Sequence, residues 1–120
     1  MTDSGRGAIS FTLTGRNFYP TAAFAGFSAR GPQAIQVASL GKAPQDGFSG
    51  YKAFADEGDP RPRWGDYAAA SVVGGDVGVA SEYIGQPGCT LAEYEATSFS
   101  CGGRRTALAN WTTRISLIRP

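Results

Sequence analysis

The sequence predicts an all-β fold of short antiparallel strands joined by tight turns and long loops. Glycine accounts for 17 of the 120 residues, proline for 7, and apolar residues for 42%. This composition favours short strands and disfavours long helices. Alternating apolar side chains recur along the chain, and Gly74 and Gly75 separate two such runs. A chain of this length normally forms one compact core, so residues 1–120 are expected to be a single domain or a fragment of one.

Six strands are predicted, each from alternating apolar side chains or a short apolar run between turn signals. In the first strand Ile9, Phe11 and Leu13 alternate with polar residues, as expected for a strand with one buried face. The second and third strands flank the turn sequence ARGP and are expected to pair as a hairpin. The six ranges are 8–14, 21–28, 34–40, 67–73, 77–84 and 111–118.

The clearest element is a β-hairpin around Gly74 and Gly75. Two glycines can take the positive φ angles of a two-residue type I′ turn, whose twist matches that of paired strands. That turn places Tyr67 opposite Glu82, and it directs Asp66 and Glu82 to opposite faces. A three-residue turn would instead bring these two carboxylates to the same face. The small side chains of both strands would let another sheet approach closely.

Two long loops are predicted, at residues 43–63 and 86–110. The second contains the sequence TLAE from Thr90, which resembles a capping box at the start of a short helical turn. It also contains Cys89 and Cys101, whose separation differs from the CxxC spacing of redox and metal sites. We predict a disulfide between them, with two free thiols as the alternative in a reducing compartment.

Composition excludes several functions. The chain has no histidine, which removes Ser-His and Cys-His nucleophilic sites and most zinc sites. Its net charge of +1 supplies no basic stripe for nucleic acid. No apolar run reaches the length of a membrane span, and the first residues, MTDSGRG, lack the features of a signal peptide. We expect no cofactor, no nucleic-acid partner, no membrane span and no metal, although the acidic residues of the first loop leave calcium as a weaker alternative.

Five blocks of the sequence carry a resemblance to a known family. In order they are YPTAAF, PQDGFSGY, RWGDYAAASVV, ASEYIG and NWTTRISLI. They resemble the C-terminal end of secreted bacterial β-propeller proteins with sialidase-like (BNR-type) repeats, which usually have YPSAA, RWGDYSA, FWxATEYI and NWGTRI in that order. The resemblance implies four-stranded blades around a central channel and an extracellular or periplasmic location. This chain would supply about one and a half blades of an incomplete propeller.

The RWGDY block contains the candidate catalytic residues. Asp66 and Glu82 are the carboxylates that glycoside hydrolysis would need as a pair. The simpler expectation is that Asp66 binds backbone amides or a nearby arginine, and that Trp64 and Tyr67 fill the core. The sialidase pattern itself, including its Asp-box repeat, is missing from the chain, so no catalytic role is carried over.

Other residues suggest binding rather than catalysis. Tyr51, Trp64 and Tyr94 could stack against a sugar, with core packing as the alternative. Arg104-Arg105 is a possible anion site, against the simpler expectation that both side chains are solvated. Asn110 begins the sequon Asn-Trp-Thr, which suggests a glycosylation site.

The sequence therefore predicts a noncatalytic structural or binding portion of a secreted β-propeller that recognises a carbohydrate or a cell surface. The alternative is a remnant of a sialidase-like glycoside hydrolase whose active site needs blades outside this chain. An incomplete propeller leaves open strand edges and a partly covered apolar face, so self-association is also expected.

Overall fold

The computed structural model of the protein describes residues 1–50, 65 and 67–119. In this part of the chain the fold is all-β, as the sequence predicts, with two antiparallel sheets and one short helix. The first sheet has the order β1-β2-β3, with β4 also paired to β2, and the second has the order β5-β6-β7. The elements are β1 (Gly7–Gly15), β2 (Phe18–Ser28), β3 (Gly31–Pro32), β4 (Gln36–Ser39), β5 (Ala69–Val73), β6 (Asp76–Tyr83), α1 (Leu91–Ala96) and β7 (Thr112–Ile118).

All six predicted strands are present, and one short strand lies where only a turn was expected. The two residues of β3 pair with the end of β2, Phe27 with Pro32 and Ser28 with Gly31. Strand β4 then pairs with the middle of β2 across a register shift. Proline is compatible with β3 because an edge strand has one side that needs no backbone donor.

The hairpin of β5 and β6 has the register expected from a two-residue turn. Val73 pairs with Asp76 and Ala69 with Ala80, and Gly74 and Gly75 have φ angles of 58° and 93°. Both glycines thus occupy the left-handed region that the turn requires and that other residues rarely adopt. When this register is continued beyond β5, Tyr67 lies opposite Glu82.

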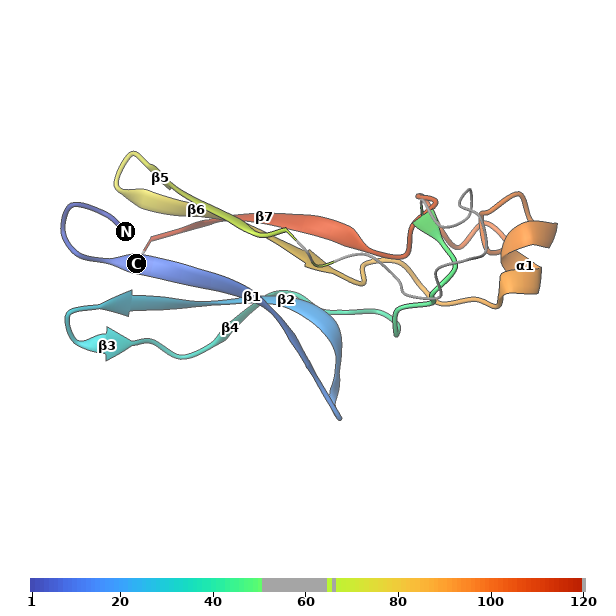
Figure 1. Cartoon of the computed structure of the whole chain (residues 1–120), viewed down its shortest axis with the longest axis horizontal. Coiled ribbons are helices and arrows are strands. Elements are labelled where there is room, and N and C mark those ends of the chain that lie inside the picture. Colours follow the sequence, from blue (N-terminus) through green and yellow to red (C-terminus); the bar gives the residue numbers. More distant parts are fainter. Residues whose placement is uncertain (51–64, 66, 120) are drawn as a thin grey trace.

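The two sheets pack face to face as two layers (Figure 1). Val77 and Val79 of β6 and Ile118 of β7 form the buried cluster between them. Ala8 of β1 and Phe24 of β2 pack against this cluster from the first sheet. We call these facing surfaces the inner faces of the sheets.

Small side chains at this interface bring the sheets very close. The Thr12 hydroxyl of β1 donates a hydrogen bond of 3.0 Å to the backbone carbonyl of Glu82, and the Ser10 hydroxyl donates one of 3.5 Å to that of Ala80. A side chain of one sheet therefore contacts the backbone of the other. The sheets thus approach closely on this face, although the small residues Ala69, Gly78 and Ala80 that suggested a close approach lie on the other face.

The opposite surfaces of the two sheets, their outer faces, carry apolar side chains that are open to solvent. Strand alternation places Ile9 of β1 and Val37 of β4 on the outer face of the first sheet, and Ile115 and Leu117 of β7 on that of the second. All four are exposed. The molecule is correspondingly elongated, with a radius of gyration of 16.8 Å, against about 13.6 Å for a compact domain of this length.

The two long connections meet in what we call the disulfide lobe, residues 42–50 and 84–111. It lies at the end of the molecule opposite the two termini and contains α1 (Figure 1). The backbone of Ile84 joins the lobe to the sheets, because its N–H donates to the carbonyl of Pro20 and its carbonyl accepts from Lys42. The described part of the predicted loop at 43–63 has no α-helix or strand, whereas the loop at 86–110 contains α1. None of the helices in the described ranges is long and apolar enough to cross a membrane.

Candidate functional site

The outer face of the second sheet contains a groove of about 280 Å³ at the end nearest the disulfide lobe. Its floor is made by alanines, because strand alternation directs Ala69 of β5 and Ala80 of β6 to this face. Because alanine side chains are short, the space that longer side chains would occupy is left open at the centre of the sheet. The lining residues are Tyr67, Ala68, Ala69, Ala80, Glu82 and Thr113.

Glu82 and Tyr67 supply the polar and aromatic groups of this groove. Tyr67 does not fill the core as the sequence suggested: it is 80% exposed, so its ring has a face available to a ligand. Glu82 is half-buried, and its Oε2 atom accepts a hydrogen bond from the backbone N–H of Gly65. An exposed ring beside a carboxylate acceptor is an arrangement that can bind the apolar face and the hydroxyls of a sugar.

The described residues do not bring a second carboxylate to Glu82. Asp46, Asp76 and Glu93 each form an ion pair with an arginine elsewhere. Asp76 is on the same strand, but it is six residues away, which corresponds to about 20 Å along the chain. The two-carboxylate arrangement of a glycoside hydrolase is therefore not assembled from the described side chains.

The remaining sequence candidates of this region lie outside the described residues. They are the predicted catalytic carboxylate Asp66 and the predicted sugar-stacking residues Trp64 and Tyr51. The acidic residues that suggested calcium also belong to the undescribed stretch. Among the residues that are described, no group of three or more His, Cys, Asp and Glu side chains is placed to hold a metal ion.

Tyr94, the other sugar-stacking candidate, is in the core of the disulfide lobe. Its side chain is only 1% exposed, and its ring packs against Phe48 and Phe99 with centroid distances of 5.4 and 5.1 Å. The hydroxyl donates a 3.0 Å hydrogen bond to the carbonyl of Leu108. The ring therefore has no face open to a ligand. It packs in the core, which was the alternative to stacking against a sugar.

A buried ion pair lies beside this ring. The Arg105 side chain has 0% exposure and that of Asp46 has 5%, and their charged atoms Nη2 and Oδ2 are 2.7 Å apart. The guanidinium carbon of Arg105 is 5.6 Å from the centroid of the Tyr94 ring, within the range of a cation–π contact. The expectation of a solvated Arg105 is wrong, because the first long loop supplies a counterion to the second.

Both partners of this ion pair are held by further hydrogen bonds. The other carboxylate oxygen of Asp46 accepts from the N–H groups of Phe48 and Ser49 and from the Ser49 hydroxyl. Arg105 Nε donates to the carbonyl of Pro87. Its Nη1 atom is buried and has no hydrogen-bond partner among the described residues. The pair thus connects two segments that are 59 positions apart in sequence.

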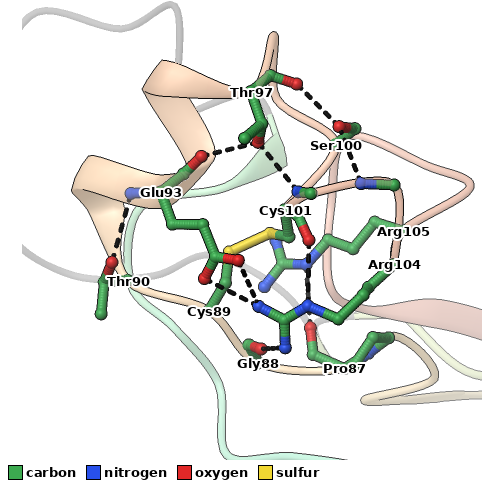
Figure 2. A network of polar contacts seen from close by, with 12 residues as sticks. Pro87, Gly88, Cys89, Thr90, Glu93, Thr97, Ser100, Cys101, Arg104 and Arg105 are labelled. Carbon is green, nitrogen blue, oxygen red and sulfur yellow. Dashed lines mark hydrogen bonds and ion pairs between the residues drawn. A yellow bond between two sulfur atoms is a disulfide. The ribbon is translucent and has the colours of Figure 1, made fainter.

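Arg104, by contrast, forms an ion pair on the surface of the lobe (Figure 2). Its Nη2 atom lies 2.6 and 2.7 Å from the two carboxylate oxygens of Glu93 in α1. The Thr90 hydroxyl accepts from the N–H of Glu93, which forms the predicted N-terminal cap, while the Glu93 carboxylate binds the arginine. Because the Arg104 side chain is half exposed, this pair stabilises the lobe only weakly.

The predicted disulfide between Cys89 and Cys101 is present (Figure 2). It joins the segment before α1 to the turn after it, and Cys101 is fully buried. Ser98, Phe99 and Cys101 have positive φ angles of 51°, 66° and 51°, a region that costs free energy for residues other than glycine. The disulfide and the hydrogen bonds of Thr97 and Ser100 hold this turn in place.

Asn110 is also part of the lobe core rather than of its surface. The residue is 0% exposed, its N–H donates to the Ser49 hydroxyl, and its Nδ2 donates to the carbonyl of Pro44. A glycosyl transferase cannot reach a buried amide, so the sequon is not accessible in the folded chain. Its asparagine joins the two long loops.

Comparisons with protein-family models, curated proteins and solved structures return no match to this chain. The described geometry has two parts, an exposed groove on the second sheet and a lobe whose ionic and aromatic side chains are used for its own core.

The Tyr94 hydroxyl makes the stability of the lobe dependent on pH. Burial raises its pKa above the usual value of 10.0, and the Arg105 guanidinium offsets part of this effect. Above pH 10 the unfolded chain releases the phenolic proton first, so the free energy of unfolding is expected to fall as the pH rises and to be unaffected by this group at lower pH. Urea unfolding between pH 9 and pH 11 measures this loss.

A phenylalanine substitution separates Tyr94 from the other titrating groups. Tyr94→Phe should reduce the loss of stability at high pH, after a pH-independent cost of about 1 kcal/mol for the hydrogen bond to Leu108. Thr106→Ala, which leaves every tyrosine in place, should lose stability at high pH as the unsubstituted chain does. An equal loss at high pH in the unsubstituted chain and in Tyr94→Phe would contradict this assignment.

Proposed function

We propose that this chain is a noncatalytic structural or binding portion of a secreted, sialidase-like β-propeller. The observation that carries the proposal is the outer face of the second sheet, where Ile115 and Leu117 are 76% and 64% exposed beside small residues of β6. An apolar sheet surface of this kind is suited to stacking against a neighbouring sheet, as blades do in a propeller. The disulfide supports a location outside the reducing cytosol.

The groove at Tyr67 and Glu82 is the site that we propose for ligand contact, with a carbohydrate as the ligand class. The Tyr67 ring is exposed, and the Glu82 carboxylate already accepts a backbone hydrogen bond. These two features favour ligand recognition over proton transfer. Trp64 and Tyr51 remain proposed contributors to the same surface.

Glycan binding and glycoside turnover can be measured on the same protein. We expect the chain to release no product from a panel of aryl glycosides that includes a sialoside. We expect glycan-array binding that Tyr67→Ala weakens about tenfold, the effect of losing one stacking ring worth about 1.4 kcal/mol. Thr106→Ala, at an exposed residue of the lobe, is the matched control and should leave binding unchanged.

A remnant of a glycoside hydrolase is the second candidate, favoured by the position of Glu82 in an open groove. Turnover of any glycoside that is abolished by Asp66→Asn or by Glu82→Gln would overturn the noncatalytic proposal. Turnover that persists in both variants would indicate a contaminating enzyme, and the noncatalytic proposal would then stand.

A further inference from the structure

We infer that the groove at Tyr67 and Glu82 prefers sugars that carry a positive charge, namely amino sugars with a free, protonated amine. This inference rests on the proposed function, in which the groove binds a carbohydrate, and it names the class of carbohydrate. Three features support it: a carboxylate without a counterion among the described residues, an exposed aromatic ring opposite that carboxylate, and a small groove with a flat floor.

The Glu82 carboxylate has no positively charged partner in the described part of the chain. Its Oε2 atom accepts a hydrogen bond from the backbone N–H of Gly65, a neutral donor, which leaves the other oxygen for a ligand. Asp46, Asp76 and Glu93, by contrast, each form an ion pair with an arginine. Glu82 is therefore the carboxylate of the second sheet that a cationic ligand can use.

The strand pattern leaves the charge of Glu82 unbalanced on the outer face. Strands β5, β6 and β7 contain one basic residue, Arg114, which pairs with Ser81 and is therefore directed toward the other side of the sheet from Glu82. Arg119 follows β7, but its Nε atom is 3.2 Å from Oδ1 of Asp76. Asp76 and Glu82 are separated by about 20 Å along β6. The described residues thus give the groove a negative charge.

The ring of Tyr67 adds a second attraction for a cation. The hairpin register places it opposite Glu82, a position at which Cβ atoms of paired strands are about 5 Å apart. An ammonium group in the groove can therefore contact the face of the exposed ring and the carboxylate together, through a cation–π contact and a charged hydrogen bond. An anionic sugar such as a sialoside would instead be repelled by the carboxylate.

The shape of the groove favours a sugar ring over a basic side chain of a peptide. Its volume of about 280 Å³ is just below the usual range for drug-sized ligands, about 300 to 1,000 Å³. The alanine floor is flat, which suits the apolar face of one ring, whereas a linear lysine side chain would leave part of it uncovered. Thr113, the cross-strand partner of Glu82, brings a hydroxyl that can bind a sugar hydroxyl.

Two disaccharides that differ only in charge test the inference. They are β-1,4-linked glucosamine, with free amines, and its N-acetylated counterpart, which is uncharged. Dissociation constants from NMR titration at low ionic strength, where screening is weak, should be about tenfold lower for the amine than for the acetylated sugar. Trilysine, measured in the same way, should bind more weakly than the free-amine disaccharide.

Two variants should abolish this preference by different means. Glu82→Gln removes the charge at nearly the same side-chain size, and Thr113→Lys places a cation opposite Glu82 that pairs with the carboxylate. In each variant the two disaccharides should bind alike. Glu93→Gln, which removes an equal charge from the surface of the disulfide lobe, is the matched control and should keep the tenfold preference. Urea unfolding identifies the variants that are folded, and either folded variant is sufficient for the test.

Several outcomes would overturn the inference. Equal affinity of the unsubstituted chain for the two disaccharides would overturn it, as would a preference that survives Glu82→Gln or Thr113→Lys. A preference that Glu93→Gln also abolishes would show attraction by overall charge, and tighter binding of trilysine would assign the groove to a basic peptide. Glycan binding without a charge preference would overturn only this inference. Glycoside turnover that Glu82→Gln abolishes would overturn the noncatalytic function and leave a measured charge preference intact.

Discussion

Replacing Asp46 with asparagine is expected to lower the free energy of unfolding by about 3 to 5 kcal/mol. Asparagine keeps the size of the side chain and an oxygen that can accept from the N–H groups of Phe48 and Ser49. It removes the charge that faces Arg105, whose side chain is fully buried in the disulfide lobe. The guanidinium would then be buried without a counterion. An unpaired buried charge is the main free-energy cost of breaking a buried ion pair. Urea unfolding at pH 7 measures the loss.

The adjacent arginine provides the control for this prediction. Arg104 pairs with Glu93 at the surface, so Glu93→Gln removes an equal charge from an exposed ion pair. We expect a loss of less than about 1 kcal/mol, because solvent screens such pairs. Similar losses in Asp46→Asn and Glu93→Gln would contradict the buried position of Arg105.

Removing the disulfide is the second substitution with a large expected effect. The bond closes a loop with a sequence separation of 12, and the double variant Cys89→Ser, Cys101→Ser should lose about 2 to 3 kcal/mol of stability. Most of this loss of stability comes from the conformational entropy that the unfolded chain gains when the disulfide no longer closes the loop. The positive φ angles of Ser98 and Phe99 add to the cost of ordering the open loop.

A reductant gives an independent measurement of the same contribution. Dithiothreitol should lower the stability of the unsubstituted chain to about that of the double serine variant and leave the variant unchanged. Equal stability of the chain with and without its disulfide would show that the lobe is ordered by packing and hydrogen bonds alone.

Local sequence signals predicted most of the β structure. Gly74 and Gly75 specify a turn of two residues, and that turn determines the register of β5 and β6. The small residues of the hairpin likewise predicted that a second sheet could pack closely. The division of strands between two sheets was not predicted, because it depends on contacts between β1 and β6, which are about 70 positions apart.

The lobe shows why the candidate site was harder to predict. Arg105 and Asp46 carry no local signal of their pairing, since they are 59 positions apart and each is flanked by residues typical of surface loops. The exposure of an aromatic ring depends in the same way on distant neighbours. Tyr94 looked like a loop aromatic in the sequence, but Phe48 from the other long loop covers it. Glu82 was found as a candidate and placed opposite Tyr67 because the hairpin register is local, but the expectation that Tyr67 fills the core is wrong, since its side chain is exposed.

Glycan binding and glycoside turnover, measured on one preparation of the unsubstituted chain, test most directly the central claim that the groove at Tyr67 and Glu82 binds a ligand without catalysis. The account predicts glycan-array binding that Tyr67→Ala weakens about tenfold and no product from a panel of aryl glycosides. Product release that Glu82→Gln abolishes, or glycan binding that Tyr67→Ala leaves unchanged, would contradict it.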